Sequence, residues 1–274
     1  MSNIQIGLQL YSVRDKMQES VEDTLRAVKE MGYDYVEFAG YFDHTAEELA
    51  ALLKKYDLKC RSVHQVIDFY LEKGEEAVKF VKTLGTEFSA IPWYSKDNYT
   101  ADKMDSTVAL FEKVGKILAD GGLKMLYHNH DFELAPYGDT LILDHLFASV
   151  PGLDPEFDTC WIKYAGYDPC EYLKTYAGRY KVVHLKDFVC DELAAGPVYA
   201  LIDKDGKEAK PKSRDEVGFR FRPVGSGMQD IPAIIDAAIK GGAELFIVEQ
   251  DQSYEQDSLE AARESREYLR SLGY

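Results

Sequence analysis

Two kinds of apolar pattern alternate along the chain. Short apolar runs, such as residues 4–12 and 245–248, are typical of strands that are buried on both faces. Longer segments, such as residues 21–31, place apolar side chains three and four positions apart, which is typical of helices that pack on a core. Ser20 before that segment and Gly32 after it are typical helix boundaries. The alternation therefore predicts parallel strands that are joined by helices.

The same strand–helix unit recurs about every 30 residues over the whole chain. We expect eight strands, over residues 4–12, 35–38, 59–63, 88–91, 123–128, 155–158, 181–184 and 245–248. We expect eight helices, over residues 21–31, 45–56, 73–84, 101–120, 141–150, 169–176, 229–240 and 258–269. Eight such units in this length predict one α/β domain over residues 1–274, a closed (β/α)₈ TIM barrel. An open doubly wound sheet is the alternative, but no G-x-G-x-x-G motif follows the first strand.

One predicted connection is longer than the others. Residues 187–222 separate the seventh strand from the seventh helix, and residues 202–208 (IDKDGKE) form a turn sequence between strand-like flanks. We therefore expect a β-hairpin insertion over the C-terminal face of the barrel. Long loops on this face usually shape the pocket. A surface flap or an oligomer contact is the alternative.

Composition and charge narrow the classes of function. The chain has 46% hydrophobic and 29% charged residues and no apolar run near the roughly 18 to 20 residues of a membrane span. The amino terminus lacks the basic and apolar regions of a signal peptide, so we expect a cytoplasmic protein without membrane contact. The formal net charge of −16 argues against a nucleic-acid partner but leaves small molecules open. Four scattered cysteines without a C-x-x-C pair predict reduced thiols.

Histidine and carboxylate side chains recur where the predicted strands end. The strand ends of a barrel converge on one pocket, so these side chains should lie close together. His128 and His130 are two positions apart, so they share one face of the fifth strand. Imidazole and carboxylate ligands suit Mn, Zn, Co or Fe better than calcium, which predicts a divalent metal site. The side chains of this kind are Glu37, His64, His128, His130, Asp158, His184 and Glu249.

A metal at the strand ends could act on a sugar. It would polarise a carbonyl as a Lewis acid while a carboxylate removes the adjacent proton, which gives a metal-bound enediolate. Lys186 shares the face of His184, so it could donate a proton or bind an oxyanion. A salt bridge from Lys186 to Asp158 or Glu156 is the alternative. We expect Glu156 one layer deeper in the barrel, in a structural ion pair.

Aromatic side chains near the strand ends could stack on a sugar ring. We expect Trp161 at the pocket rim, and Trp93 and Tyr94 follow the fourth strand; ordinary loop packing is the alternative for all three. Residues 225–227 (GSG) before the seventh helix are similar to a phosphate cradle, but the segment is short and contains no lysine. A non-phosphorylated sugar or cyclitol is therefore the expected substrate.

Four motifs make the chain resemble the sugar phosphate isomerase/epimerase group of the xylose isomerase-like TIM barrel superfamily. They lie at residues 127–133 (YHNHDFE), 156–161 (EFDTCW), 184–187 (HLKD) and 248–251 (VEQD). The group it resembles includes tagatose epimerases and inosose dehydratase, with endonuclease IV as a more distant relative. The resemblance covers essentially the whole chain, and it implies the superfamily but no particular substrate.

The resemblance implies one divalent metal held by Glu, Asp, His and Glu from strands five to eight. The last three ligands carry over onto Asp158, His184 and Glu249. His128 stands where the first Glu is expected, so His128 is the predicted ligand and Glu133 is the alternative. That Glu is also one of two acid/base carboxylates in the epimerases, and inosose dehydratases have a similar His-rich stretch. The resemblance therefore leaves both epimerisation and elimination open.

The first hypothesis for function is a metal-dependent isomerase or epimerase of a sugar or keto-sugar, with Glu249 as base and ligand. The alternative is a lyase or dehydratase of a keto-sugar or inosose, in which His130 or Lys186 assists the leaving group. A third hypothesis is a sugar-binding barrel without catalysis, and the negative charge disfavours an endonuclease. A homo-oligomer is compatible with the sequence. The remaining candidates, which we expect to bind substrate, are His64, Glu37, Trp161 and Glu133.

Overall fold

The structure is a computed structural model that describes residues 4–193 and 213–274. Eight parallel strands form one sheet in the order β2-β1-β12-β9-β8-β5-β4-β3. Isolated parallel bridges, one of them between Phe38 and Val63, join the two outer strands, so the sheet closes into a barrel. This arrangement confirms the predicted (β/α)₈ TIM barrel, and the open-sheet alternative is wrong. The strands are β1 (Gln5–Gln9), β2 (Tyr35–Glu37), β3 (Ser62–His64), β4 (Phe88–Ile91), β5 (Lys124–His128), β8 (Leu153–Asp158), β9 (Val182–Leu185) and β12 (Leu245–Val248).

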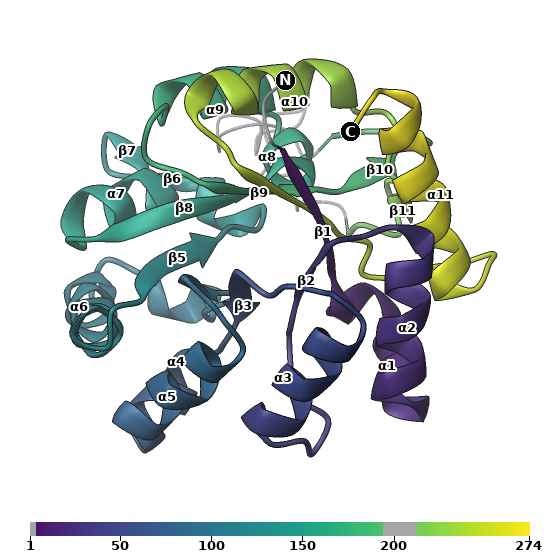
Figure 1. The fold of residues 1–274 in the computed structure, drawn as a ribbon. Coiled ribbons are helices and arrows are strands. Elements are labelled where there is room, and N and C mark those ends of the chain that lie inside the picture. The colour runs from purple at the N-terminus through teal and green to yellow at the C-terminus, as the bar shows by residue number, and fades with distance from the viewer. Residues whose placement is uncertain (1–3, 194–212) are drawn as a thin grey trace.

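Helices follow the strands and surround the barrel, as Figure 1 shows. Thr45 and Glu48 form a reciprocal capping box at the start of one helix, and Gly32 ends another with φ of 90°. Within the described residues, no helix is both long and apolar enough to span a membrane. The helices are α1 (Arg14–Glu19), α2 (Val21–Met31), α3 (Ala46–Lys55), α4 (Ile67–Lys73), α5 (Glu75–Thr83), α6 (Met104–Asp120), α7 (Ile142–Ser149), α8 (Thr159–Tyr164), α9 (Pro169–Thr175), α10 (Ile231–Gly241) and α11 (Ser258–Ser271).

Some elements differ from those predicted. The first strand ends early, at Gln9, because the Gln9 side chain accepts from the Tyr11 N–H and starts the 3₁₀ turn η1 (Leu10–Val13). The single helix expected between the third and fourth strands is two helices, α4 and α5, separated by Gly74. Helix α8 has no counterpart in the predicted elements. It begins directly after strand β8, and its cap is Asp158. Further short elements are η2 (Lys96–Asn98), η3 (Phe132–Leu134), β6 (Pro136–Tyr137) and β7 (Thr140–Leu141).

The insertion after β9 begins and ends in paired strands. Strand β10 (Asp187–Val189) pairs antiparallel with β11 (Arg220–Arg222), which confirms the base of the predicted hairpin. The turn expected at residues 202–208 lies outside the described residues. A buried apolar cluster ties both ends of the insertion to helix α8. The cluster consists of Cys160, Trp161, Tyr164, Phe188, Val217, Phe219 and Phe221.

The inside of the barrel changes from apolar to polar along the strands. Alternate residues of a strand share a face, so inward positions can be followed along one strand. Leu245 and Ile247 of β12 belong to a buried apolar layer, and Glu249 follows on the same face. Leu126 of β5 belongs to the same layer and leads to His128. The polar layer therefore lies at the carboxyl ends of the strands, where TIM barrels carry their active sites.

The glycine-rich segment at residues 225–227 binds a carboxylate of the chain itself. The N–H groups of Gly225 and Gly227 each donate to Asp187 Oδ2 at 3.0 Å. The N–H groups of Gln229 and Phe188 donate to Asp187 Oδ1 at 3.1 Å and 2.9 Å. The amides that the sequence suggested as a phosphate cradle are therefore already used by Asp187.

Replacing Asp187 with Ala should lower the free energy of unfolding by about 2 to 3 kcal/mol, because several backbone donors lose a charged acceptor. Chemical denaturation followed by circular dichroism would measure the change. Asp215→Ala is the control, since the exposed Asp215 side chain pairs with Arg220 on the surface, and it should stay within about 0.5 kcal/mol. Equal stability of the two variants would contradict the role given to Asp187.

Candidate metal centre

Neighbouring strands place imidazoles and carboxylates side by side at the carboxyl end of the barrel. Parallel pairing sets His128 of β5 beside Glu156 of β8, and Asp158 of β8 beside His184 of β9. All of these side chains are buried. Glu156 and Asp158 are two positions apart on one strand, so the same strand contributes a carboxylate to two successive layers.

Asp158 is fixed by its surroundings with one oxygen left over. Its Oδ1 caps helix α8 by accepting from the N–H groups of Cys160 at 2.8 Å and Trp161 at 3.3 Å. The Asn129 side chain holds the Asp158 backbone through hydrogen bonds of 3.0 Å and 3.3 Å. Asp158 Oδ2 is buried and makes no hydrogen bond among the described residues, although the Lys186 ammonium lies 3.2 Å away.

One set of side chains, which we call the outer group, could hold a metal ion. Its members are His128, Asp158, His184 and Glu249. His128 Nε2 lies 3.5 Å from Asp158 Oδ2 and 3.9 Å from Glu249 Oε2, and His184 Nδ1 lies 2.9 Å from Glu249 Oε2. Bonds of about 2.1 Å to one ion place its ligand atoms roughly 3 to 4 Å apart. The spacing and the buried, unbonded Asp158 Oδ2 therefore fit a divalent ion.

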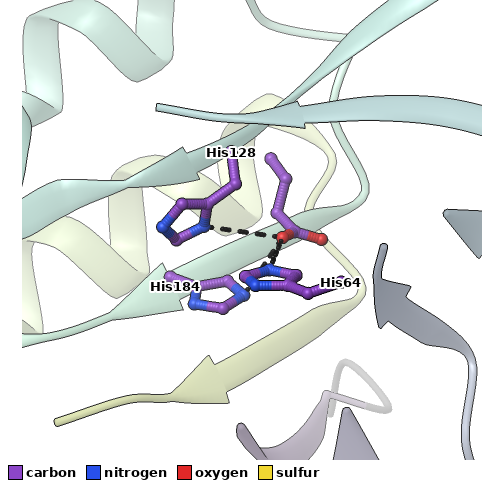
Figure 2. Close-up of side chains that lie close together, drawn as sticks. His64, His128 and His184 are labelled. Carbon is purple, nitrogen blue, oxygen red and sulfur yellow. Dashed lines mark hydrogen bonds and ion pairs between the residues drawn. The ribbon is translucent and has the colours of Figure 1, made fainter. Parts of the chain in front are cut away.

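A second set, which we call the inner group, consists of three imidazoles around one carboxylate. Its members are His64, His128, Glu156 and His184. Figure 2 shows the three imidazoles converging on one carboxylate. Glu156 Oε1 lies 2.6 Å from His64 Nε2, 3.2 Å from His184 Nε2 and 3.6 Å from His128 Nδ1. Glu37 Oε2 adds a second carboxylate, 2.8 Å from His184 Nε2 and 3.1 Å from His64 Nε2.

Lys186 places a buried ammonium against the outer group. Its Nζ lies 2.7 Å from Asp251 Oδ1, 3.2 Å from Asp158 Oδ2 and 3.3 Å from Glu249 Oε2. The aromatic face of Trp161 lies on another side, with its ring centroid 5.0 Å from Nζ. The salt bridge to Asp158 that the sequence left open is therefore present, together with two further carboxylate partners.

Burial and neighbouring charges set the protonation of the outer group. Burial lowers the pKa of His128 to about 3, so its imidazole is neutral and offers a lone pair. Burial raises the pKa of Asp158 to about 6. Burial also raises the pKa of Glu249, but Lys186 and His184 outweigh it and hold that pKa well below its usual value. Glu249 therefore stays ionised at neutral pH, as a ligand or a base requires.

A cavity of about 480 Å³ opens onto the outer group. Its polar lining includes Lys186 and Glu249. Its apolar lining includes Tyr11, Val66 and Trp93, which are 41%, 48% and 52% exposed. A sugar or cyclitol suits such a cavity, because its hydroxyls can bind the polar wall while its C–H face packs on aromatic and aliphatic groups.

Two of the predicted substrate contacts lie in this cavity or just behind it. His64 lines the cavity, as does His130, which was predicted to be catalytic. Glu37 is fully buried and accepts a hydrogen bond from Gln9 Nε2 at 2.8 Å. Glu37 therefore supports the imidazoles of the inner group from behind.

Trp161 does not occupy the predicted rim. It is 1% exposed and stacks on Phe219 of the insertion, with ring centroids 5.6 Å apart. The guanidinium of Arg214 lies 4.1 Å from the centroid of the same indole. The insertion thus covers Trp161, and the exposed tryptophan of the cavity is Trp93.

Glu133 is buried away from both groups. The Tyr127 hydroxyl donates to Glu133 Oε1 at 2.5 Å, and the His130 N–H donates to Glu133 Oε2 at 2.8 Å. Tyr127 precedes His128 on the strand, so it faces outward, and Tyr99 OH lies 2.6 Å from its hydroxyl. The structure thus places His128, and not Glu133, beside the other candidate ligands.

Asp251 is a further site residue, which the pattern of histidines and carboxylates at strand ends did not single out. Asp251 lines the cavity and is the nearest carboxylate to the Lys186 ammonium. Burial raises its pKa, against the opposing effect of Lys186. The available signal was its spacing, because Asp251 follows Glu249 by two positions in the same strand-end motif.

The chain is similar in sequence to a protein family and to several characterised proteins. A family model described as xylose isomerase-like TIM barrel matches residues 25–272. The chain is 27% identical over 167 residues to inosose dehydratase of Clostridium botulinum (strain Alaska E43 / Type E3), over 58% of this chain and 51% of that protein. It is 24% identical over 200 residues to inosose dehydratase of Geobacillus kaustophilus (strain HTA426), over 63% of each. The matched region thus spans about half to just under two thirds of these relatives.

Solved structures resemble the whole chain at lower identity. A sugar phosphate isomerase/epimerase from Parabacteroides distasonis ATCC 8503 superimposes with a TM-score of 0.75 and 18% identity, covering 99% of this chain and 95% of that one. An L-ribulose 3-epimerase superimposes with a TM-score of 0.66 and 14% identity, covering 98% and 94%. At these identities the likeness concerns the fold.

Proposed function

Because this chain belongs to the xylose isomerase-like TIM barrel family, we propose that it is a divalent-metal-dependent lyase that acts on a keto-sugar or keto-cyclitol. Glu249 removes the proton next to the carbonyl, and a β-substituent of the substrate then leaves. The observation that carries this proposal is the pairing of Glu249 with Lys186 in one cavity, where Oε2 and Nζ lie 3.3 Å apart. An ionised carboxylate and a neighbouring ammonium are the base and acid that elimination requires.

The outer group would hold the ion through His128, Asp158, His184 and Glu249. A divalent ion bound there supplies Lewis acidity, which polarises the substrate carbonyl and stabilises negative charge on its oxygen. Manganese, zinc, cobalt and iron all suit this donor set. The residues of the chain orient the substrate between this polar wall and the apolar wall that contains Trp93.

The proton transfers balance within the pair. Glu249 accepts the proton from the carbon next to the carbonyl, and the C–H electrons form an enolate. The enolate returns its electrons, the bond to the β-oxygen breaks, and Lys186 donates a proton to the departing oxygen. Glu249 is then protonated and Lys186 neutral, and their separation of 3.3 Å lets the proton pass back directly.

Elimination is favoured over epimerisation by the residue at the end of β5. Epimerisation through two carboxylates needs a second base on the opposite face of the substrate. The resemblance implies a Glu for this base at the end of β5, and this chain has His128 at that position. Burial lowers the pKa of His128 to about 3, so it is a poor proton acceptor. The inosose dehydratases to which the chain is similar also agree with elimination.

Isomerisation or epimerisation is the second candidate, and the cavity carboxylate Asp251 favours it. Asp251 could serve as a further acid/base group, because burial raises its pKa above the usual value. It follows Glu249 on the same strand end, however, so it approaches the substrate from the same side.

Product analysis distinguishes the two functions. Purified protein loaded with manganese or zinc is incubated with an inosose and with ketohexoses, and the products are analysed by mass spectrometry. Loss of water or of a larger β-substituent supports the lyase. A product of unchanged mass with a new configuration or carbonyl position supports the isomerase or epimerase and overturns elimination.

Lys186→Met tests the acid in this scheme. We expect product formation to fall about 100-fold, while solvent-hydrogen exchange next to the carbonyl stays within about 10-fold of wild type, because only the leaving group loses its proton donor. Lys181→Met is the control, since Lys181 precedes the same strand at its other end and pairs with Glu244. An equal loss of exchange and product formation would contradict the role of Lys186.

A further inference from the structure

We propose that the substrate carries an aromatic substituent on the ring carbon opposite its carbonyl, and that the apolar wall of the cavity binds this substituent. The inference rests on the function proposed above, because that function places the carbonyl at the outer group. It narrows the substrate class to a keto-cyclitol or keto-sugar with an attached aromatic group. The substituent takes no part in the bond changes, so it stays with the product of elimination.

The two sides of the cavity come from two halves of the barrel. The neighbouring strands β4, β3, β2 and β1 lead into the apolar side, whereas β5, β9 and β12 lead into the polar side. His64 and Gln65 are polar exceptions in the first half. A ring whose carbonyl faces the outer group therefore turns its opposite carbon toward the apolar side. The apolar wall consists of Tyr11, Val66, Phe69, Pro92 and Trp93.

The apolar wall contains most of the large apolar side chains that are exposed on the described part of the chain. There are five such side chains, and Tyr11, Val66 and Trp93 line the cavity. The other two, Met228 and Tyr254, do not line it. Contact of apolar surface with water is unfavourable, so exposed apolar side chains that gather in one place mark a binding site.

The rings of the apolar wall are prepared for an aromatic group. Trp93 is half exposed, and no aromatic ring of the described residues stacks on it. Tyr11 is held from one side, because the Arg14 guanidinium lies 4.1 Å from its ring centroid. Arg14 is itself fixed by donating to the backbone oxygens of Tyr11 at 2.9 Å and Asp251 at 2.7 Å. Aromatic rings attract one another beyond the burial of their area, so a flat ring fits this wall better than an alkyl chain.

The shape of the cavity suits one small molecule with a polar and an apolar part. Its volume of about 480 Å³ lies in the range of pockets for drug-sized ligands, which are larger than one sugar ring. The apolar wall and the outer group border the same cavity, so one molecule can reach both. A second copy of the chain would need a contact face of about 800 Å², whereas these side chains line a concave site.

The test compares an inosose with the same inosose that carries a benzyl ether on the carbon opposite its carbonyl. In protein loaded with manganese or zinc, kcat/KM for the ether should exceed that for the parent about 10-fold or more, because a buried phenyl group adds binding energy. Mass spectrometry should find the benzyl group on the dehydrated product. Trp93→Ala and Val66→Ser should each lower the preference for the ether about 3- to 10-fold.

Tyr254→Ala is the matched control. Tyr254 is an exposed aromatic residue outside the cavity, with the Arg220 guanidinium 5.3 Å from its ring centroid. This variant should keep the wild-type preference for the ether. Equal kcat/KM for the two inososes, or a preference that persists unchanged in both Trp93→Ala and Val66→Ser, overturns the inference and leaves the lyase standing.

A titration without chemistry separates the inference from the proposed function. The probes are myo-inositol, which has no carbonyl, and a mono-O-benzyl ether of it, and binding is measured by isothermal titration calorimetry. If neither inosose reacts, the lyase is overturned, and the titrations decide whether the apolar wall binds an aromatic group. Tighter binding of the ether that weakens in Trp93→Ala supports this role, and equal binding of both probes overturns it. A wild-type dimer that dissociates in Trp93→Ala, seen by light scattering, would assign the wall to a second copy and also overturn it.

Discussion

Replacing Glu249 with Gln should lower the rate of solvent-hydrogen exchange next to the substrate carbonyl by about 10⁴-fold, the upper range for loss of a general base. The amide has nearly the shape of the carboxylate, but it cannot accept the proton. Its oxygen can still face His184 and Lys186, which lie 2.9 Å and 3.3 Å from Glu249 Oε2. Deuterium incorporation from heavy water into a keto-sugar or inosose, followed by mass spectrometry, measures the exchange.

The matched control for this prediction is Glu244→Gln. Glu244 directly precedes strand β12, whereas Glu249 directly follows it, and Glu244 pairs with Arg61 and Lys181 on the opposite face of the barrel. Its exchange rate should equal that of wild type. Full exchange in Glu249→Gln with metal bound would remove Glu249 as the base under both candidate functions, because lyase and isomerase share this first step.

The sequence predicts the barrel because its signals are local and repeat. Alternating strands and helices have different periods of apolar residues, and a parallel strand order follows from them. The outer group is predictable for the same reason: Asp158, His184 and Glu249 stand at strand ends, and strand ends of a barrel converge. The deeper position of Glu156 also follows from counting alternate residues along β8.

Other features depend on contacts between distant segments, so the local pattern cannot reveal them. Trp161 follows a strand end, which predicts a place at the rim, but Phe219 of the insertion stacks on it. Glu133 was a plausible ligand by proximity in sequence, but the chain turns after His128 and directs its carboxylate to Tyr127. The glycine-rich segment resembles a phosphate cradle in sequence, but its amides donate to Asp187, which lies far from it along the chain.

Replacing Asp158 with Asn should reduce the affinity for manganese or zinc by more than about 100-fold. A loss of roughly 100-fold is the upper range for removing a residue that only hydrogen-bonds to a metal ligand. Asn remains a good helix cap, so helix α8 should persist while Oδ2 loses its negative charge. Metal content after dialysis and a binding titration measure the effect. The fold can be checked separately, because circular dichroism should match wild type.

The control for Asp158 is Asp168, which caps helix α9 outside the cavity by accepting from the Cys170 N–H at 2.8 Å. Asp168→Ala should cost about 1 kcal/mol of stability through the lost cap and leave metal affinity unchanged. The two variants thus separate capping from metal binding. Asp158→Asn keeps a helix cap and loses the charge of a ligand, whereas Asp168→Ala loses a helix cap and leaves the ligands unchanged. Equal metal affinity in wild type and Asp158→Asn would reject Asp158 as a ligand, and with it a metal site built from the outer group.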